Sequence, residues 1–185
     1  MNVYDFDKTI YNGDSTLDFY FYCLHRNPKI IKLFINQLSA AAKYKFGKTD
    51  KESFKEAFFC FLPVLKDIDT SIIDFWDINE SKIKSWYKEY HRHDDVIISA
   101  SPEFLLKEIC IRLDIKYLIA SKVDKYTGKF LSKNCHDSEK VTRFYESFPD
   151  GKIENFYSDS RSDLPLAEIS GNSFLVKKNN ISQWF

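Results

Sequence analysis

The sequence lacks the features of a membrane-spanning or secreted chain. None of its apolar runs approaches the roughly 18 consecutive residues that a membrane-spanning helix needs. Two aspartates stand within the first seven positions, where a secretory signal would place a basic and then an apolar region. There is also no internal repeat and no low-complexity linker. We therefore expect a soluble, cytoplasmic protein.

The chain also lacks a net charge, because 27 basic side chains balance 27 acidic ones. No global electrostatic field then draws the protein to nucleic acid or to a lipid surface. We expect neither a nucleic-acid partner nor a membrane partner, so recognition must come from local groups. Nothing in the composition indicates the oligomeric state.

Cysteines are few and widely separated. The four form no CxxC pair, and three of them fall within apolar helical patterns (Cys23, Cys60, Cys110 and Cys135). This spacing argues against a zinc site or a disulfide framework and favours buried thiols in a reducing compartment.

Hydrophobic periodicity divides the chain into two parts. A length of 185 residues with 44% hydrophobic content suffices for one core and a small accessory unit. Residues 2 to 5 show a short apolar strand pattern, and the next such pattern, VIISAS, begins only at residue 96. Between them apolar residues recur at intervals of three and four, which predicts helices over residues 15–26, 29–46, 50–62 and 69–92.

After residue 95, strand and helix patterns alternate. VIISA precedes PEFLLKEICIRL, YLIASKVD precedes DSEKVTRFYESF, KIENFYSD precedes DLPLAEI, and SFLVK follows. Such alternation indicates βαβ units, in which helices cover both faces of a parallel sheet. We predict an α/β fold with a Rossmann-like, three-layer α/β/α core of residues 1–14 and 94–185. The mainly parallel sheet of this core would carry an inserted helical cap, residues 15–93.

The stretch VYDFDKT places two aspartates one residue apart directly after a strand, where neighbouring like charges repel. Other polar side chains also follow predicted strands: Ser99 and Ser101 close VIISAS, and Asp159 follows KIENFYS. Ligands of open α/β sheets bind beyond the carboxyl ends of the strands. We therefore expect these groups to meet in one crevice.

Several carboxylates in one crevice cannot all ionise unless a cation neutralises them. Oxygen ligands with few protein carboxylates suit Mg²⁺, which keeps several waters and binds alongside phosphate. Lys140, one turn into the helix pattern DSEKVTRF, adds a fixed positive charge. A carboxylate nucleophile, a second carboxyl, Mg²⁺, a lysine and a hydroxyl together suit phosphoryl transfer.

These segments resemble the four ordered motifs of the haloacid dehalogenase superfamily. The motifs are DFDKT at residues 5–9, the strand ending at Ser99 in IISASPE, Lys140, and SDSRSD at residues 158–163. A single DxDxT is weak, but four motifs in order at the expected elements are a strong signal. The long gap between the first two resembles subfamily IB, the phosphoserine-phosphatase-like branch, which carries a helical C1-type cap there.

The resemblance implies a role for each matching residue. Asp5 would attack phosphorus to form an aspartyl-phosphate and would also ligate Mg²⁺. Asp7 would act as acid and base and would offer its carbonyl to the metal. Ser99 and the adjacent Ala100 would bind phosphoryl oxygens, and Lys140 would neutralise the nucleophile and its phosphorylated form.

The remaining matches would support the metal and the first loop. Asp159 would complete the Mg²⁺ ligands, Thr9 would steady the loop after the first strand, and Asp163 and Ser162 would lie behind the metal ligands. Ser162 stands where phosphoserine phosphatases commonly have Asn, and residues 100–102 lack their glycines. The substrate therefore stays open among amino-acid, sugar or polyol, and lipid-precursor phosphates.

Two residues near the motifs have alternative interpretations. Asp14 stands where related phosphatases place an acidic cap residue that binds substrate, but before Ser15 it also fits a helix N-cap. Arg161 would meet a second anionic group of the substrate or would face solvent.

The sequence thus predicts a Mg²⁺-dependent phosphatase that hydrolyses a small phosphomonoester through an aspartyl-phosphate. Two other functions remain open. One is a phosphotransferase that uses an acceptor alcohol, and the other is a catalytically silent binding module on the same fold.

Overall fold

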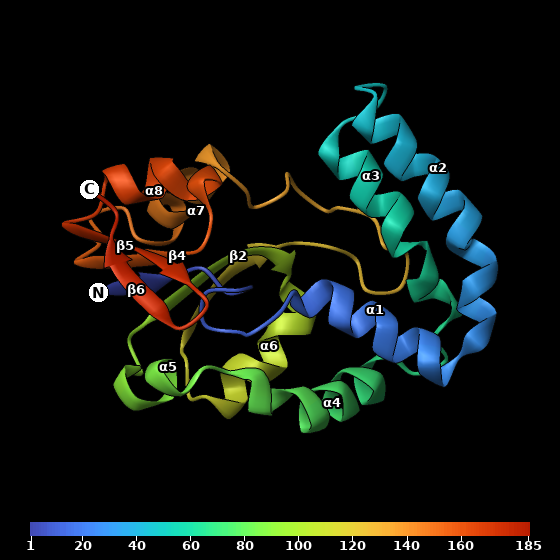
Figure 1. Ribbon diagram of the computed structural model, residues 1–185, viewed down its shortest axis with the longest axis horizontal. Coiled ribbons are helices and arrows are strands. Elements are labelled where there is room, and N and C mark those ends of the chain that lie inside the picture. Colours follow the sequence, from blue (N-terminus) through green and yellow to red (C-terminus); the bar gives the residue numbers. More distant parts are fainter.

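A computed structural model describes all 185 residues and shows one six-stranded sheet in the order β3-β2-β1-β4-β5-β6 (Figure 1). The strands are β1 (Asn2–Tyr4), β2 (Val96–Pro102), β3 (Tyr117–Ser121), β4 (Asn155–Ser158), β5 (Asn172–Lys177) and β6 (Asn180–Gln183). Neighbouring strands from β3 to β5 pair in parallel, and only β6 is antiparallel. The predicted α/β class with a mainly parallel sheet is confirmed.

Eight α-helices surround the sheet. They are α1 (Ser15–Arg26), α2 (Phe34–Lys45), α3 (Lys51–Phe58), α4 (Ile68–Asn79), α5 (Ser85–Tyr90), α6 (Glu103–Arg112), α7 (Ser138–Ser147) and α8 (Leu164–Glu168). The short 3-10 helices are η1 (Pro28–Leu33), η2 (Phe59–Val64), η3 (Glu80–Lys82) and η4 (Arg161–Asp163). None of the helices has both the length and the apolar character required to cross a bilayer.

In the central strands, successive side chains point to opposite faces of the sheet and are buried on both. Val3 and Ile98 point into a cluster with Phe144 of α7 and Leu166 of α8. Their neighbours Tyr4 and Ile97 belong to a larger cluster that includes side chains of α4, α5 and α6. Figure 1 shows the sheet between these two groups of helices. The result is a three-layer α/β/α core, in which period-two alternation fixes which face each residue occupies.

Helices α1 to α5 all lie between β1 and β2 in the sequence, as the position of the insertion predicted. They do not form one separate unit. Trp76 of α4 donates its indole N–H to the Leu105 carbonyl of α6 at 2.7 Å, and the Tyr87 ring of α5 meets Tyr4 edge-on. Residues 15–93 therefore combine helices that pack on the core, such as α4 and α5, with the outlying pair α2 and α3 (Figure 1).

The helix predicted over residues 69–92 is interrupted in the structure, and this prediction was wrong. Between α4 and α5 the backbone pairs with the loop after β1: Ile83 bridges Tyr11, and Lys84 N–H donates to the Ile10 carbonyl at 2.8 Å. Local periodicity does not encode such a contact between distant segments. Strand β6 also escaped prediction, because its four residues are exposed and show no apolar alternation.

Candidate active site

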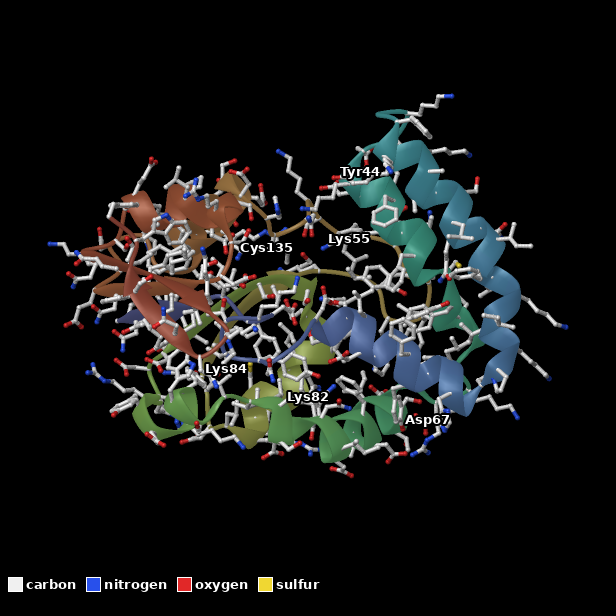
Figure 2. The ribbon with its side chains drawn as sticks, viewed as in Figure 1. Tyr44, Lys55, Asp67, Lys82, Lys84 and Cys135 are labelled. Atoms are coloured by element: carbon white, nitrogen blue, oxygen red, sulfur yellow. The ribbon has the colours of Figure 1, made fainter.

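The loop after β1 carries the first two aspartates out of the sheet. Asp5 still donates its N–H to the Tyr157 carbonyl of β4 at 2.9 Å, so it occupies the last paired position of the strand. Lys8 then adopts a left-handed conformation with φ of 60°, which turns the chain back on itself. The buried amine of Lys84, labelled in Figure 2, donates to the Lys8 carbonyl at 2.5 Å and supports this turn.

A cavity of about 270 Å³ opens at the carboxyl ends of β1, β2 and β4. The structure brings most of the predicted site residues to its wall: Asp5, Asp7, Asp14, Ser99, Ala100, Lys140, Asp159, Ser162 and Asp163. Thr9 lies buried behind the wall, and Arg161 is exposed outside it. Segments separated by up to 158 positions thus meet at one place because parallel strands end on one edge of the sheet.

Lys140 is the buried cation of the cavity, with 2% of its surface exposed. Its amine donates to Asp5 Oδ1 and to Asp163 Oδ2, each at 2.8 Å. Burial alone lowers the pKa of a lysine, but these two carboxylates outweigh it and raise the pKa of Lys140, which therefore stays charged. Burial raises the pKa of Asp5, Lys140 opposes that rise, and Asp163 adds to it.

Both carboxylate oxygens of Asp7 are held in place. Oδ1 accepts the Ser15 backbone N–H at 2.6 Å, at the start of α1, and Oδ2 accepts the Ser101 hydroxyl. Burial and the nearby Asp14 raise the pKa of Asp7 to about 6, although the hydrogen bonds from Ser101 and Ser15 lower it. Asp7 can therefore change its protonation state near neutral pH, as an acid and base must.

Asp159 supplies a carboxylate without a protein partner. Its backbone N–H donates to Thr9 Oγ1 at 2.9 Å, and the same hydroxyl donates to Asp5 Oδ2 at 3.3 Å. Thr9 therefore ties the loop after β1 to the loop after β4. The Asp159 side chain itself forms no hydrogen bond or ion pair with the protein, and burial raises its pKa.

Asp14 serves as the N-cap of α1 and also lines the cavity. Its carboxylate accepts the Leu17 N–H at 3.0 Å, which satisfies one free donor of the first helical turn. The N-cap interpretation is thus confirmed, while contact with substrate stays a prediction.

Asp163 is held from a second side by the Ser158 hydroxyl, which donates to Oδ2 at 2.7 Å.

Sequence reasoning missed two residues at this site and the role of a third. Ser101 was expected in the crevice as a strand-end hydroxyl, but its hydrogen bond to Asp7 was not predicted. His136 lines the cavity from the loop before α7, and burial lowers its pKa. Lys55 reaches the cavity wall from α3. A histidine or lysine outside the four motifs has no spacing signal, so only the folded chain identifies it.

Lys55 connects the outlying helix α3 to the cavity wall. Its amine donates to the Ala100 carbonyl at 2.8 Å and to Asn134 Oδ1 at 2.9 Å. Figure 2 labels this side chain on α3. Burial, together with the nearby Lys51, lowers the pKa of Lys55 from 10.5 to about 8. A cap side chain thus reaches the segment that follows Ser99.

This shift predicts how the stability contribution of Lys55 depends on pH. Between about pH 8 and about pH 10.5 the unfolded chain binds more protons at Lys55 than the folded chain does. The free energy of unfolding therefore rises with pH in this interval. Relative to Lys55→Met, the wild type should gain about 1 to 2 kcal/mol across this interval, since solvent access reduces the full effect. Urea unfolding of both proteins at several pH values measures the difference. The exposed Lys66→Met is the control, and a pH-independent difference for Lys55→Met would contradict the prediction.

The fold and the site together define an enzyme of the α/β class with an acidic cavity at the carboxyl ends of its parallel strands. The chain belongs to the haloacid dehalogenase-like hydrolase family, whose sequence model matches residues 3–168. The resemblance seen in the four motifs is thereby confirmed at the level of the family. No curated protein sequence matches the chain.

Solved structures share the fold at low sequence identity. A protein of unknown function from Bordetella pertussis Tohama I has a TM-score of 0.78 at 18% identity, over 94% of this chain and 87% of that one. A phosphoserine phosphohydrolase-like protein from Francisella tularensis has a TM-score of 0.56 at 15% identity, over 94% and 86%. A probable phosphoserine phosphatase from Vibrio cholerae has a TM-score of 0.57 at 12% identity, over 93% and 55%.

Proposed function

We propose that this hydrolase is a Mg²⁺-dependent phosphatase of small phosphomonoesters that works through an aspartyl-phosphate on Asp5. The observation that carries the proposal is the meeting of Asp5, the buried Lys140 and the unpartnered Asp159 in one small cavity. A carboxylate held by a buried lysine, beside a second carboxylate without a partner, suits the binding of a phosphate and a cation together.

Asp5 is the proposed nucleophile. Its carboxylate oxygen forms a bond to phosphorus while the bond from phosphorus to the ester oxygen breaks, and Asp7 gives its proton to the departing alkoxide. Asp7 then takes a proton from water, whose oxygen attacks phosphorus and releases inorganic phosphate and Asp5. The hydrogen bonds of Asp7 to Ser15 and Ser101 keep its carboxyl group in a fixed orientation through both steps.

Lys140 and Ser99 are the proposed ligands of the phosphoryl group. Lys140 already contacts Asp5 and would neutralise the charge that the phosphoryl oxygens bring. The Ser99 hydroxyl accepts the Ser101 N–H at 3.1 Å, so its own proton is free to bond a phosphoryl oxygen. Ala100 lies next to it on the cavity wall, where its backbone completes this side of the phosphate site.

The donor set fits Mg²⁺. No group of three His, Cys, Asp or Glu side chains lies close enough to form an all-side-chain metal site. The carboxylates of Asp5 and Asp159 with the Asp7 carbonyl would supply a smaller oxygen set, and Mg²⁺ accepts such a set because it keeps several waters. When bound, the ion would neutralise charge on the phosphoryl oxygens. Asp163 and Ser162 would stabilise the loop that presents Asp159.

The size of the cavity and the fold relatives support a small substrate. A volume of about 270 Å³ accommodates a compact phosphate ester. Two of the proteins that share the fold are described as phosphoserine phosphohydrolase-like and as a probable phosphoserine phosphatase, which places phosphoserine-like esters first among the compounds to test.

A metal titration tests the proposal. The purified protein should release phosphate from members of a panel of metabolite phosphates, lose this activity in EDTA and regain it on addition of Mg²⁺. Asp159→Asn should require roughly 10 to 100 times more Mg²⁺ for half-maximal activity, because the variant loses an anionic ligand. The exposed Asp150→Asn should behave as wild type.

Two results would contradict the proposal. One is phosphatase activity that is unchanged in EDTA, and the other is an equal Mg²⁺ requirement in wild type and Asp159→Asn. Phosphate transfer to added alcohols that exceeds release to water would instead assign a phosphotransferase.

A further inference from the structure

The outer helix of the cap exposes an apolar stripe. Its members, called the cap stripe here, are large side chains of η1 and α2 and the residue after α2: Ile31, Phe34, Ile35, Leu38 and Phe46. Their intervals of three, four and eight residues place them along one side of a helix. Ile35 is 76% exposed and Leu38 is 53% exposed, so the stripe faces away from the core.

The opposite side of α2 already holds the helix against the protein. Gln37 is its one buried residue, and it accepts a hydrogen bond from Tyr20 and donates to the Phe58 carbonyl. Tyr44 stacks on Phe54 of α3 with ring centroids 5.1 Å apart. The inward side therefore packs through Gln37 and Tyr44, and the large apolar side chains of the other side stay exposed. A continuous exposed apolar surface of this kind marks an interaction site.

The segment that carries the cap stripe has charges of one sign. Residues 28–49 contain five lysines and no aspartate or glutamate (Lys29, Lys32, Lys43, Lys45 and Lys48). All five are exposed, and none takes part in an ion pair. The balanced net charge of the whole chain therefore conceals a local positive field around an apolar surface.

We propose that the cap stripe docks on the surface of an anionic lipid bilayer. Apolar side chains inserted at the level of the headgroups, with lysines beside anionic lipids, are the two contributions that hold an interfacial helix. The protein would lie on the bilayer without crossing it. This inference goes beyond the proposed chemistry, and it replaces the expectation of no membrane partner drawn from net charge.

Charge complementarity favours a bilayer over the other partners. In a symmetric pair of copies the five lysines of each cap stripe region would face one another with no acidic residue between them, which opposes association. Nucleic acid supplies the negative charge, and its bases can stack on Phe34 and Phe46, but it offers no apolar environment for the aliphatic Ile31, Ile35 and Leu38. An anionic bilayer satisfies both the lysines and the aliphatic side chains.

The position of α2 is compatible with an accessible active site. Figure 1 shows α2 at the outer edge of the molecule, with α3 beside it. Lys55 of α3, and not α2, reaches the wall of the cavity. A bilayer against the cap stripe would therefore contact the cap and leave the cavity open.

Vesicle sedimentation tests the proposal with the full chain. Wild type should sediment with phosphatidylcholine vesicles that contain phosphatidylglycerol and remain in solution with phosphatidylcholine alone, and added salt should weaken binding. The double variant Ile35→Asp/Leu38→Asp should bind more than about tenfold more weakly. Lys43→Glu/Lys45→Glu should weaken binding by about fivefold or more for each lysine.

The controls separate docking from folding and from catalysis. Ile111→Asp on α6 alters an apolar side chain that is 65% exposed outside the cap stripe, and it should bind vesicles as wild type. Circular dichroism of each variant reports folding, and hydrolysis of a soluble phosphate ester should be unchanged by the cap-stripe substitutions. If the protein bound vesicles as expected but did not hydrolyse phosphate esters, the result would contradict the proposed function and leave the docking proposal standing.

Three results would overturn the proposal. The first is no sedimentation with any vesicle. The second is equal vesicle binding by wild type and Ile35→Asp/Leu38→Asp. The third is a wild-type dimer in analytical ultracentrifugation that the same substitutions dissociate, which would assign the cap stripe to a second copy of the chain.

Discussion

Asp5→Asn should lower the rate of phosphate ester hydrolysis by at least about 10³-fold, because an amide oxygen does not replace a carboxylate as nucleophile. The wild type, quenched in acid during turnover, should carry the mass of one phosphate on the peptide that contains Asp5. The variant should lack this mass. Steady-state kinetics and peptide mass spectrometry measure the two effects.

The same experiment separates the open functions. Asp124→Asn, which alters an aspartate on the exposed turn after β3, is the matched control. It should keep full activity, and its Asp5 peptide should carry the mass of one phosphate. Equal activity in wild type and Asp5→Asn would remove Asp5 as nucleophile. A wild type without activity toward every ester tested would favour the catalytically silent binding module.

Lys140→Met should destabilise the folded protein by about 3 to 5 kcal/mol near neutral pH and should also abolish hydrolysis. The substitution removes the only ion-pair partner of both Asp5 and Asp163, and leaves two carboxylates buried together. Chemical unfolding in EDTA measures this cost without the contribution of a bound metal. Lys107→Met on the exposed side of α6 is the control.

The deficit of Lys140→Met should depend on pH in a defined direction. Burial raises the pKa of Asp5 above its unfolded value even in the wild type, and loss of the opposing lysine raises it further. Between the unfolded and the folded value the native state binds more protons, so the stability of the variant falls as pH rises. Below about pH 7 the native wild type also binds this proton, so the two proteins lose stability in parallel, and we expect the deficit of the variant to widen above about pH 7, where only the variant still holds the proton. A deficit of equal size at about pH 6 and about pH 8.5 would contradict this account.

The fold class and most of the cavity wall were accessible from the sequence for one physical reason. Parallel strands end on one edge of a sheet, so residues that directly follow such strands converge whatever their separation in the chain. Asp5 follows β1, Asp159 follows β4, and Ser99 lies in β2 where its regular register with β3 stops before a bulge. Recognising the strands was therefore sufficient to predict that these side chains meet.

Other features needed contacts that local periodicity does not record. The helix predicted over residues 69–92 ends early because Ile83 pairs with Tyr11, and β6 forms because it pairs with β5. Lys55 reaches the cavity wall only because α3 packs over the segment that contains Ala100. The contacts of Ile83 and Lys55 join residues at least 45 positions apart, which no window along the chain contains, and the exposed residues of β6 show no apolar alternation that would indicate its pairing.

By itself, the sequence determined the order of the parallel strands and of the helices between them after residue 95, and the chemistry at the strand ends, because both follow from patterns a few residues long. Only the tertiary structure decided which face of α2 is buried. Its apolar stripe has the spacing of a core-facing helix, yet Gln37 and Tyr44 on the other side make the contacts and leave Ile35 in solvent. Contacts with Tyr20, Phe58 and Phe54 determine which face of α2 is buried, and they leave the cap stripe outside the core.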